Sequence, residues 1–216
     1  MRQNCVVFSP AAKTAAACGI VSDSMETKCS QEMFERCRDV VLNECARALR
    51  SVEADQVLKY LDLVQAAEKV FFVGVGRVML SLQAIAKRYN HIGIESVVVG
   101  QVTEPAITAN DVLVVGSGSG ERLVPLAIAR KAKSLGARVA HIGSEPESSM
   151  KGIADVFVRI SVAAKRRRTD DIVSSQPMTT LFDQSLLLLG DITAKMMIEQ
   201  RCIAKADLWK RHANLE

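Results

Sequence analysis

The chain is organised around the stretch Val112-Leu113-Val114-Val115-Gly116-Ser117-Gly118-Ser119-Gly120-Glu121-Arg122. Its four leading apolar residues are typical of a strand that is buried in a parallel sheet. Glycine and serine then alternate, and an apolar helical pattern follows over residues 123–132. A strand, a loop of small residues and a helix N-terminus in this order can hold an anion. Glycine lets the backbone approach the ligand, and the helix start offers unpaired N–H groups and a favourable dipole.

The loop favours one phosphate group as its ligand. The hydroxyls of Ser117 and Ser119 add donors on short side chains, and Gly118 and Gly120 leave the backbone accessible. The alternative is a flexible turn, but a turn needs one glycine and no interleaved serines. No Gly-Lys-Ser/Thr follows, so the loop is not a P-loop, and no lysine is placed to clamp the β- and γ-phosphates of a nucleotide. We therefore expect a monophosphate ligand.

The same kind of apolar segment occurs five times. The segments start near Val70, Ser96, Val112, Arg138 and Asp155, and each is separated from the next by a helical pattern or a turn. Strands that alternate with helices predict a parallel sheet covered on both faces, an α/β sandwich of three layers. Ligands of such sheets lie outside the carboxyl ends of the strands, where the strand order reverses. All the glycine-rich loops are expected at that edge.

Two amphipathic helices, at about residues 29–50 and 54–67, precede the first strand. Their apolar stripes would suit packing against another subunit as well as against the sheet. Residues 1–28 have no clear periodicity and are expected to form a loosely ordered extension, with residues 29–216 as a single domain.

Composition restricts the class of protein. The chain has 216 residues, of which 49% are hydrophobic and 24% charged, and a net charge of +4, too mild to argue for nucleic acid as a partner. No apolar run reaches the length of a membrane span, and the run at residues 5–8 is too short for a signal peptide. The six cysteines have no metal-binding spacing, so we expect free thiols, a cytoplasmic location and no metal.

The loop after the first strand, Gly74-Val75-Gly76-Arg77, begins like a dinucleotide-binding fingerprint. The third glycine of that fingerprint is missing, and the next strand ends in Gly100-Gln101 instead of an acidic residue. An NAD-dependent oxidoreductase is therefore not expected. Arg77 could reach an anion at the sheet edge or be a solvated loop residue.

Three further features have both a functional and a plain interpretation. His91 near a helix C-terminus and Asp183 in the first turn of a helix could simply complement helix dipoles. The basic run Lys165-Arg166-Arg167-Arg168 is typical of a solvated loop, and a lid over an anionic substrate is the alternative.

Several motifs extend this interpretation. They are Gly116–Glu121, Pro146-Glu147-Ser148, Gln176-Pro177-Met178, Thr180-Leu181-Phe182 and the tail His212-Ala213-Asn214-Leu215-Glu216. In these motifs the chain from Cys29 to Glu216 resembles the sugar isomerase (SIS) domain family, and within it the 6-phospho-3-hexuloisomerases. The resemblance implies a flavodoxin-like sheet and a homotetramer with shared active sites. It also implies conversion of 3-hexulose 6-phosphate to fructose 6-phosphate in the ribulose monophosphate pathway, without a cofactor.

The resemblance also implies roles for individual residues. The serine loop (Ser117–Gly120) holds the phosphate, the carboxylate after Thr-Leu-Phe is the catalytic base and corresponds to Asp183, and the histidine before glycine corresponds to His91. Either His91 or His212 could serve the pocket of a neighbouring subunit. The chemistry fits these residue types, because one carboxylate can relay a proton through a cis-enediolate while a histidine or arginine stabilises the oxyanion.

The chain departs from the family pattern at several positions. Val78-Met79 replaces Ser-Gly, Gln101 an acidic residue and Thr179 a glycine. Arg122 replaces a threonine and could bind the phosphate bidentately. Asp183 stands where the family has Glu, and a base misplaced by ~1 Å can cost about 10²-fold in rate. The alternative function is therefore a diverged SIS domain that isomerises another sugar phosphate or only senses one.

Overall fold

A computed structural model describes residues 19–163 and 168–215, and it divides the chain into two compact units, Met1–Asp39 and Val40–Glu216. Helix α1 (Gly19–Arg50) runs through the boundary between them. It begins at Gly19, well before Cys29, so part of the segment expected to form a loosely ordered extension is helical. After Gly19 this segment has neither glycine nor proline, and it contains good helix formers such as Met25 and Glu26. Residues 1–18 of the expected extension lie outside the described residues.

The second unit contains a five-stranded sheet with the order β2-β1-β3-β4-β5, and every pairing is parallel. This confirms the predicted flavodoxin-like sheet, which two N-terminal helices precede. The strands are β1 (Val70–Val73), β2 (Ser96–Val98), β3 (Val112–Gly116), β4 (Arg138–Gly143) and β5 (Val156–Arg159). The chain leaves β1 toward β2 and returns to β3 on the other side. The point where strand order reverses therefore lies between β1 and β3, where such sheets bind ligands.

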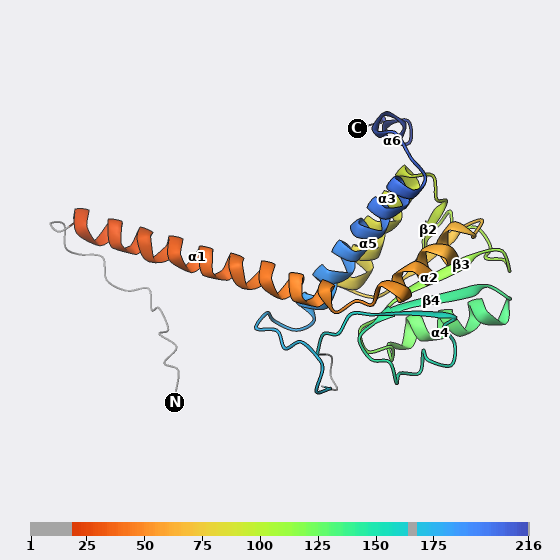
Figure 1. The fold of residues 1–216 in the computed structure, drawn as a ribbon, viewed down its shortest axis with the longest axis horizontal. Coiled ribbons are helices and arrows are strands. Elements are labelled where there is room, and N and C mark those ends of the chain that lie inside the picture. The colour runs from red at the N-terminus through yellow and green to blue at the C-terminus, as the bar shows by residue number, and fades with distance from the viewer. Residues whose placement is uncertain (1–18, 164–167, 216) are drawn as a thin grey trace. The chain divides into compact units, whose positions relative to one another are not determined.

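Helices cover both faces of the sheet (Figure 1). The helices that follow α1 in the chain are α2 (Ala54–Gln65), α3 (Arg77–His91), α4 (Leu123–Ser134), α5 (Thr180–Gln200) and α6 (Lys205–Trp209). Because side chains alternate along a strand, Val70 and Phe72 belong to one core, with α2, α3 and α5, and Phe71 and Val73 to the other, with α4. Between β4 and β5 the chain forms no helix. Residues 144–153 form turns and bends there, in a segment that contains Pro146.

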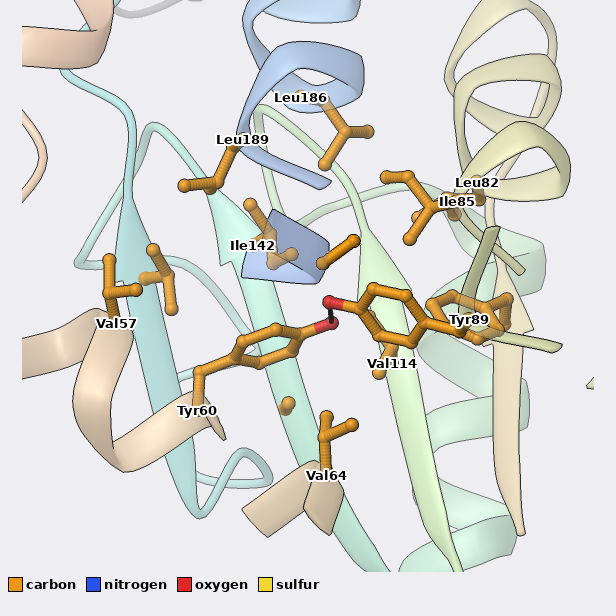
Figure 2. Close-up of a cluster of buried hydrophobic side chains, with 14 of the residues drawn as sticks. Val57, Tyr60, Val64, Leu82, Ile85, Tyr89, Val114, Ile142, Leu186 and Leu189 are labelled. Atoms are coloured by element: carbon orange, nitrogen blue, oxygen red, sulfur yellow. Dashed lines mark hydrogen bonds between the residues drawn. The ribbon is translucent and has the colours of Figure 1, made fainter. Parts of the chain in front are cut away.

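The core under α2, α3 and α5 sets how these helices pack (Figure 2). The hydroxyl groups of Tyr60 and Tyr89 are 3.2 Å apart, and the Tyr89 hydroxyl is 2.7 Å from that of Thr193. At Gly190 a Cβ atom would lie 2.2 Å from Cγ1 of Ile85, so glycine allows α5 to approach α3 closely. This contact fixes the two helices that bring Arg77 and Asp183 to the same pocket.

None of the helices in the described residues is long and apolar enough to span a membrane. The four described cysteines, Cys29, Cys37, Cys45 and Cys202, are free thiols, as predicted. Within the same residues no group of histidine, cysteine, aspartate and glutamate is arranged to hold a metal ion.

Candidate active site

A pocket of about 550 Å³ lies at the carboxyl ends of β1 and β3, the predicted edge of the sheet. Most of its lining comes from three segments: the β1–α3 loop with the start of α3, the β3–α4 loop, and the residues that lead into and begin α5; Ser144 and Ala163 complete it. Its lining includes Arg77, Ser117, Gly118, Ser119, Arg122, Thr179 and Asp183. Six of the nine residues predicted for the site therefore meet at one cavity, although they come from segments that are far apart in the sequence.

The serine loop is held by its carbonyl groups. The carbonyl oxygen of Ser117 lies 2.9 Å from Nε2 of His141 and accepts a hydrogen bond from the Gly120 N–H at 3.2 Å. The Gly118 carbonyl accepts from the N–H groups of Ser144 at 2.9 Å and Glu145 at 3.1 Å. Both carbonyls are thus bonded to the protein and not turned toward the cavity.

The fixed carbonyls orient the amides of the loop. In a trans peptide the N–H points opposite to the C=O, so the N–H groups of Gly118 and Ser119 point away from the bonded carbonyls. Neither N–H has a hydrogen-bond partner among the described residues, and both residues line the pocket. Two unpaired amides beside serine hydroxyls at the start of α4 form a suitable site for a phosphate group.

Gly120, the last residue of the loop, is not among the residues that line the pocket. Its φ of 65° is in the left-handed region, which glycine adopts without a steric cost. Its N–H also donates to Oγ of Ser117 at 3.1 Å. Gly120 therefore shapes the loop, and its predicted role in binding would be indirect.

His141, in β4, is a part of this site that the sequence did not point to. Its ring is buried and stacks on Phe157, with the ring centroids 5.0 Å apart. Burial lowers the pKa of His141 to about 4, so the imidazole is neutral near pH 7. Because the Ser117 carbonyl can only accept, Nε2 must carry the proton in this hydrogen bond. The one available signal was a histidine among the apolar residues of a buried strand.

Two arginines bring positive charge to the pocket. Arg77 is the first residue of α3, and Arg122 is the N-cap residue of α4. Both line the cavity. The Arg77 side chain is 64% exposed and also pairs with Asp183, so this residue lies at the pocket and is solvated as well.

Asp183 is the buried carboxylate of the pocket, with a relative exposure of 3%. Its Oδ2 accepts a hydrogen bond from Nε of Arg77 at 3.2 Å, whereas its buried Oδ1 has no hydrogen-bond partner. Burial raises the pKa of Asp183, and Arg77 opposes the rise. A carboxylate with one oriented and one unpaired oxygen can accept a proton from a ligand in the cavity.

Val78 does not close the pocket. A Cβ at Gly74 or Gly116 would lie 3.1 or 2.8 Å from Cγ1 of Val78, so these glycines make room for the valine side chain. Val78 lines one side of the cavity, and Met79 is not among the lining residues. The substitution of the family's Ser-Gly pair thus makes this wall more apolar while the cavity stays open.

His91 and His212 lie together but outside this pocket. Their rings stack with centroids 5.2 Å apart at the C-terminal end of α3. Since Arg77 and His91 are the two ends of that helix, roughly 20 Å separates them. Nε2 of His91 is buried without a partner, and burial, then Arg88, Lys87 and His212, lower the pKa of His91. One chain alone therefore does not bring these histidines to Asp183.

The segment after β5 is tied to the turn beside the serine loop. Arg159 forms ion pairs with Asp170 at 2.6 Å and Asp171 at 3.1 Å, and its Nε donates to the Ser144 carbonyl at 3.2 Å. Arg168 pairs with Glu145 at 3.4 Å. The rest of the basic run, residues 165–167, lies outside the described residues, so the lid remains a hypothesis.

Comparison with known proteins defines the class. One similar structure is the crystal structure of a Methanococcus jannaschii protein, for which a function of 3-hexulose-6-phosphate isomerase has been inferred. The match has a TM-score of 0.72 and 26% sequence identity, and it covers 84% of this chain and 99% of that protein. The chain has the SIS fold and is a phosphosugar isomerase. No family model matches the chain.

The relatives found by sequence define the family more narrowly than the structural comparison does. The Mycobacterium gastri 3-hexulose-6-phosphate isomerase is 33% identical over 209 residues, which is 97% of this chain and all of the relative. The Bacillus subtilis protein of the same name is 31% identical over 176 residues, 82% of this chain and 95% of its own. The chain belongs to the 3-hexulose-6-phosphate isomerase family. This confirms the resemblance inferred from the motifs.

Proposed function

We propose that the protein converts 3-hexulose 6-phosphate to fructose 6-phosphate through a cis-enediolate. The observation that carries the proposal is the buried Asp183, which lines the same pocket as the serine loop and whose Oδ1 has no hydrogen-bond partner. An anchored phosphate and a carboxylate in one cavity are what a proton relay between adjacent sugar carbons needs. The relatives that are named 3-hexulose-6-phosphate isomerase support this substrate.

In the proposed complex the phosphate binds the serine loop. The amides of Gly118 and Ser119 and the hydroxyl of Ser119 would donate to its oxygens, and Arg122 would pair with its charge. These donors come from a loop whose carbonyls are already bonded, so little reorganisation is needed on binding. In this proposal Arg122 compensates for the loss of the threonine that the family has at its position.

Asp183 would then act as the base. It takes the proton from C2 of the 3-ketose and returns it to C3, while the hydroxyl proton of O2 moves to O3, so that the carbonyl shifts by one carbon. Arg77, which orients Oδ2 of Asp183 at 3.2 Å, is also placed to stabilise the enediolate oxygens. The reaction involves no net oxidation, and the proposed steps use no metal or cofactor.

We further propose a homotetramer in which His91 or His212 completes the pocket of a neighbouring subunit. The buried and unpartnered Nε2 of His91 supports this, because one chain holds that atom far from Asp183. The proposed setting is cytoplasmic sugar phosphate metabolism, the ribulose monophosphate pathway, with no nucleic acid or membrane partner.

The test is turnover of 3-hexulose 6-phosphate by the wild type and by Asp183→Asn. The loss of a general base predicts a fall in kcat of about 10²–10⁴-fold. Binding of inorganic phosphate, measured by calorimetry, is expected to persist in the variant. Asp62→Asn, an exposed aspartate on α2, is the control and should keep full activity. Full turnover by Asp183→Asn would remove Asp183 from the mechanism.

A further inference from the structure

A buried carboxylate on α1 holds the segment that leads into the pocket. Glu44 is 9% exposed, and its carboxylate accepts four hydrogen bonds from three consecutive residues. The donors are Oγ of Ser174 at 2.6 Å, the N–H of Ser175 at 2.8 Å, Oγ of Ser175 at 2.9 Å and Nε2 of Gln176 at 3.0 Å. Burial alone would raise the pKa of Glu44, but these donors lower it to about 2, so the group is ionised near pH 7.

The residues after this anchor form one wall of the pocket. Pro177, Met178 and Thr179 all line it, and the Thr179 carbonyl accepts the Asp183 N–H at 3.0 Å in the first turn of α5. Any displacement of this segment would therefore move the proposed base as well as the wall.

The backbone of this wall is strained. Met178 has a φ of 55°, in the left-handed region, at a cost of roughly 1–2 kcal/mol for a residue with a side chain. Its side chain is 98% exposed, so its own packing does not hold that conformation. Such a conformation persists only where the surrounding structure fixes it. The bonds of Glu44 to Ser174–Gln176, which are separated from Met178 only by Pro177, fix the chain at this point.

The neighbouring residue on α1 holds the other end of the same segment. Sγ of Cys45 donates to Oε1 of Gln184 at 3.4 Å, and Gln184 follows Asp183 directly. Two consecutive residues of one helix thus contact the chain on both sides of the wall, at Ser174–Gln176 and at Gln184.

We propose that Glu44 is a positioning residue for the reaction: it fixes residues 174–180 so that Asp183 meets the substrate correctly. This inference rests on the proposed function. Glu44 does not line the pocket, so it acts through the segment that it holds. The serine loop is held separately, by His141 and the Ser144–Glu145 turn, and phosphate binding should not depend on Glu44.

The experiment compares Glu44→Ala and Glu44→Gln with Glu32→Gln, an exposed glutamate on the same helix. Glu44→Ala removes all four hydrogen bonds, and kcat per folded molecule should fall about 10–100-fold, as expected for a base displaced by ~1 Å. Glu44→Gln keeps one acceptor oxygen and should be intermediate. The affinity for inorganic phosphate should change by less than about 2-fold, because independent sites do not couple. Glu32→Gln should behave as the wild type.

Hydrogen exchange separates positioning from general stability. In Glu44→Ala, exchange should accelerate at residues 174–183 and not in the sheet. Ser175→Ala, which leaves the carboxylate in place but removes one donor, should produce a smaller change in the same segment. Full turnover by Glu44→Ala would overturn the proposal, and so would a loss of turnover accompanied by faster exchange throughout the sheet and weaker phosphate binding.

If the wild type does not turn over the sugar phosphate, the proposed function fails and the exchange data decide the role of Glu44. Acceleration confined to residues 174–183 would still support the anchor. Unchanged exchange there would overturn it.

Discussion

The serine loop has little room for a side chain at Gly120, and the substitution Gly120→Ala tests this directly. A Cβ at this position would lie 2.2 Å from Oγ and 2.5 Å from Cβ of Ser148. The Ser148 hydroxyl could rotate away, but its Cβ could move only with the backbone. The φ of 65° adds a second, independent cost for alanine.

The two costs can be added approximately. A left-handed conformation costs a residue with a side chain roughly 1–2 kcal/mol, and overpacking a well-packed site costs about 1–3 kcal/mol. The free energy of unfolding should therefore fall by about 2–5 kcal/mol. For a chain of this size each kcal/mol lowers Tm by about 2–4 °C, so the expected decrease in Tm is about 5–20 °C.

Thermal unfolding measures the change, and two variants separate its causes. Gly152→Ala is the control, because a Cβ there meets nothing within 4 Å, and its Tm should stay close to that of the wild type. Adding Ser148→Gly to Gly120→Ala should restore the part of Tm that is lost to overpacking and leave the part that is lost to the left-handed backbone. Phosphate binding should also weaken, since the Gly120 N–H bonds Oγ of Ser117. If Gly120→Ala is as stable as Gly152→Ala, the described geometry of the loop is wrong.

Three other predictions concern His141, Asp183 and Glu44. His141→Leu leaves the Ser117 carbonyl with one donor, and calorimetry should show inorganic phosphate binding weakened about 3–10-fold. His141→Gln can still donate and should lose less affinity. Equal phosphate affinity in the wild type and both variants would contradict this. Because burial raises the pKa of Asp183, kcat should fall as pH decreases through a value above the ordinary aspartate range, and a flat profile down to pH 4 would argue against its role as base. The pKa of Glu44 is lowered from 4.5 to about 2, so the ionised carboxylate stabilises the fold above pH 4.5. In urea unfolding its advantage over Glu44→Gln should shrink as pH falls from 4.5 through 2, and an undiminished advantage at pH 2 would refute this.

The sequence predicted the sheet because each strand is a local signal. Val70–Val73 and Val112–Val115 are continuous apolar runs that each end in a glycine-rich loop, and such runs can be recognised without knowledge of distant contacts. The serine loop could be recognised for the same reason. The start of α1 could not, because residues 19–28 lack the apolar stripe by which a helix is recognised.

The remaining parts of the site depend on contacts between distant residues. His141 supports Ser117 from the adjacent strand, and Glu44 bonds Ser174 from another part of the chain. Neither partner can be found by periodicity, because each pairing exists only after the sheet and helices have packed. The predicted roles of His91 and His212 came from the family resemblance, and their test depends on the homotetramer proposed above.

The most direct test of the central claim is exchange of carbon-bound hydrogen with solvent. Fructose 6-phosphate is incubated with the protein in D₂O and followed by NMR. We predict that the wild type incorporates deuterium at the carbon next to the carbonyl, C3, and that Asp183→Asn does not, although it still binds phosphate. Absence of label with the wild type, or equal label with both proteins, would contradict a proton relay by Asp183.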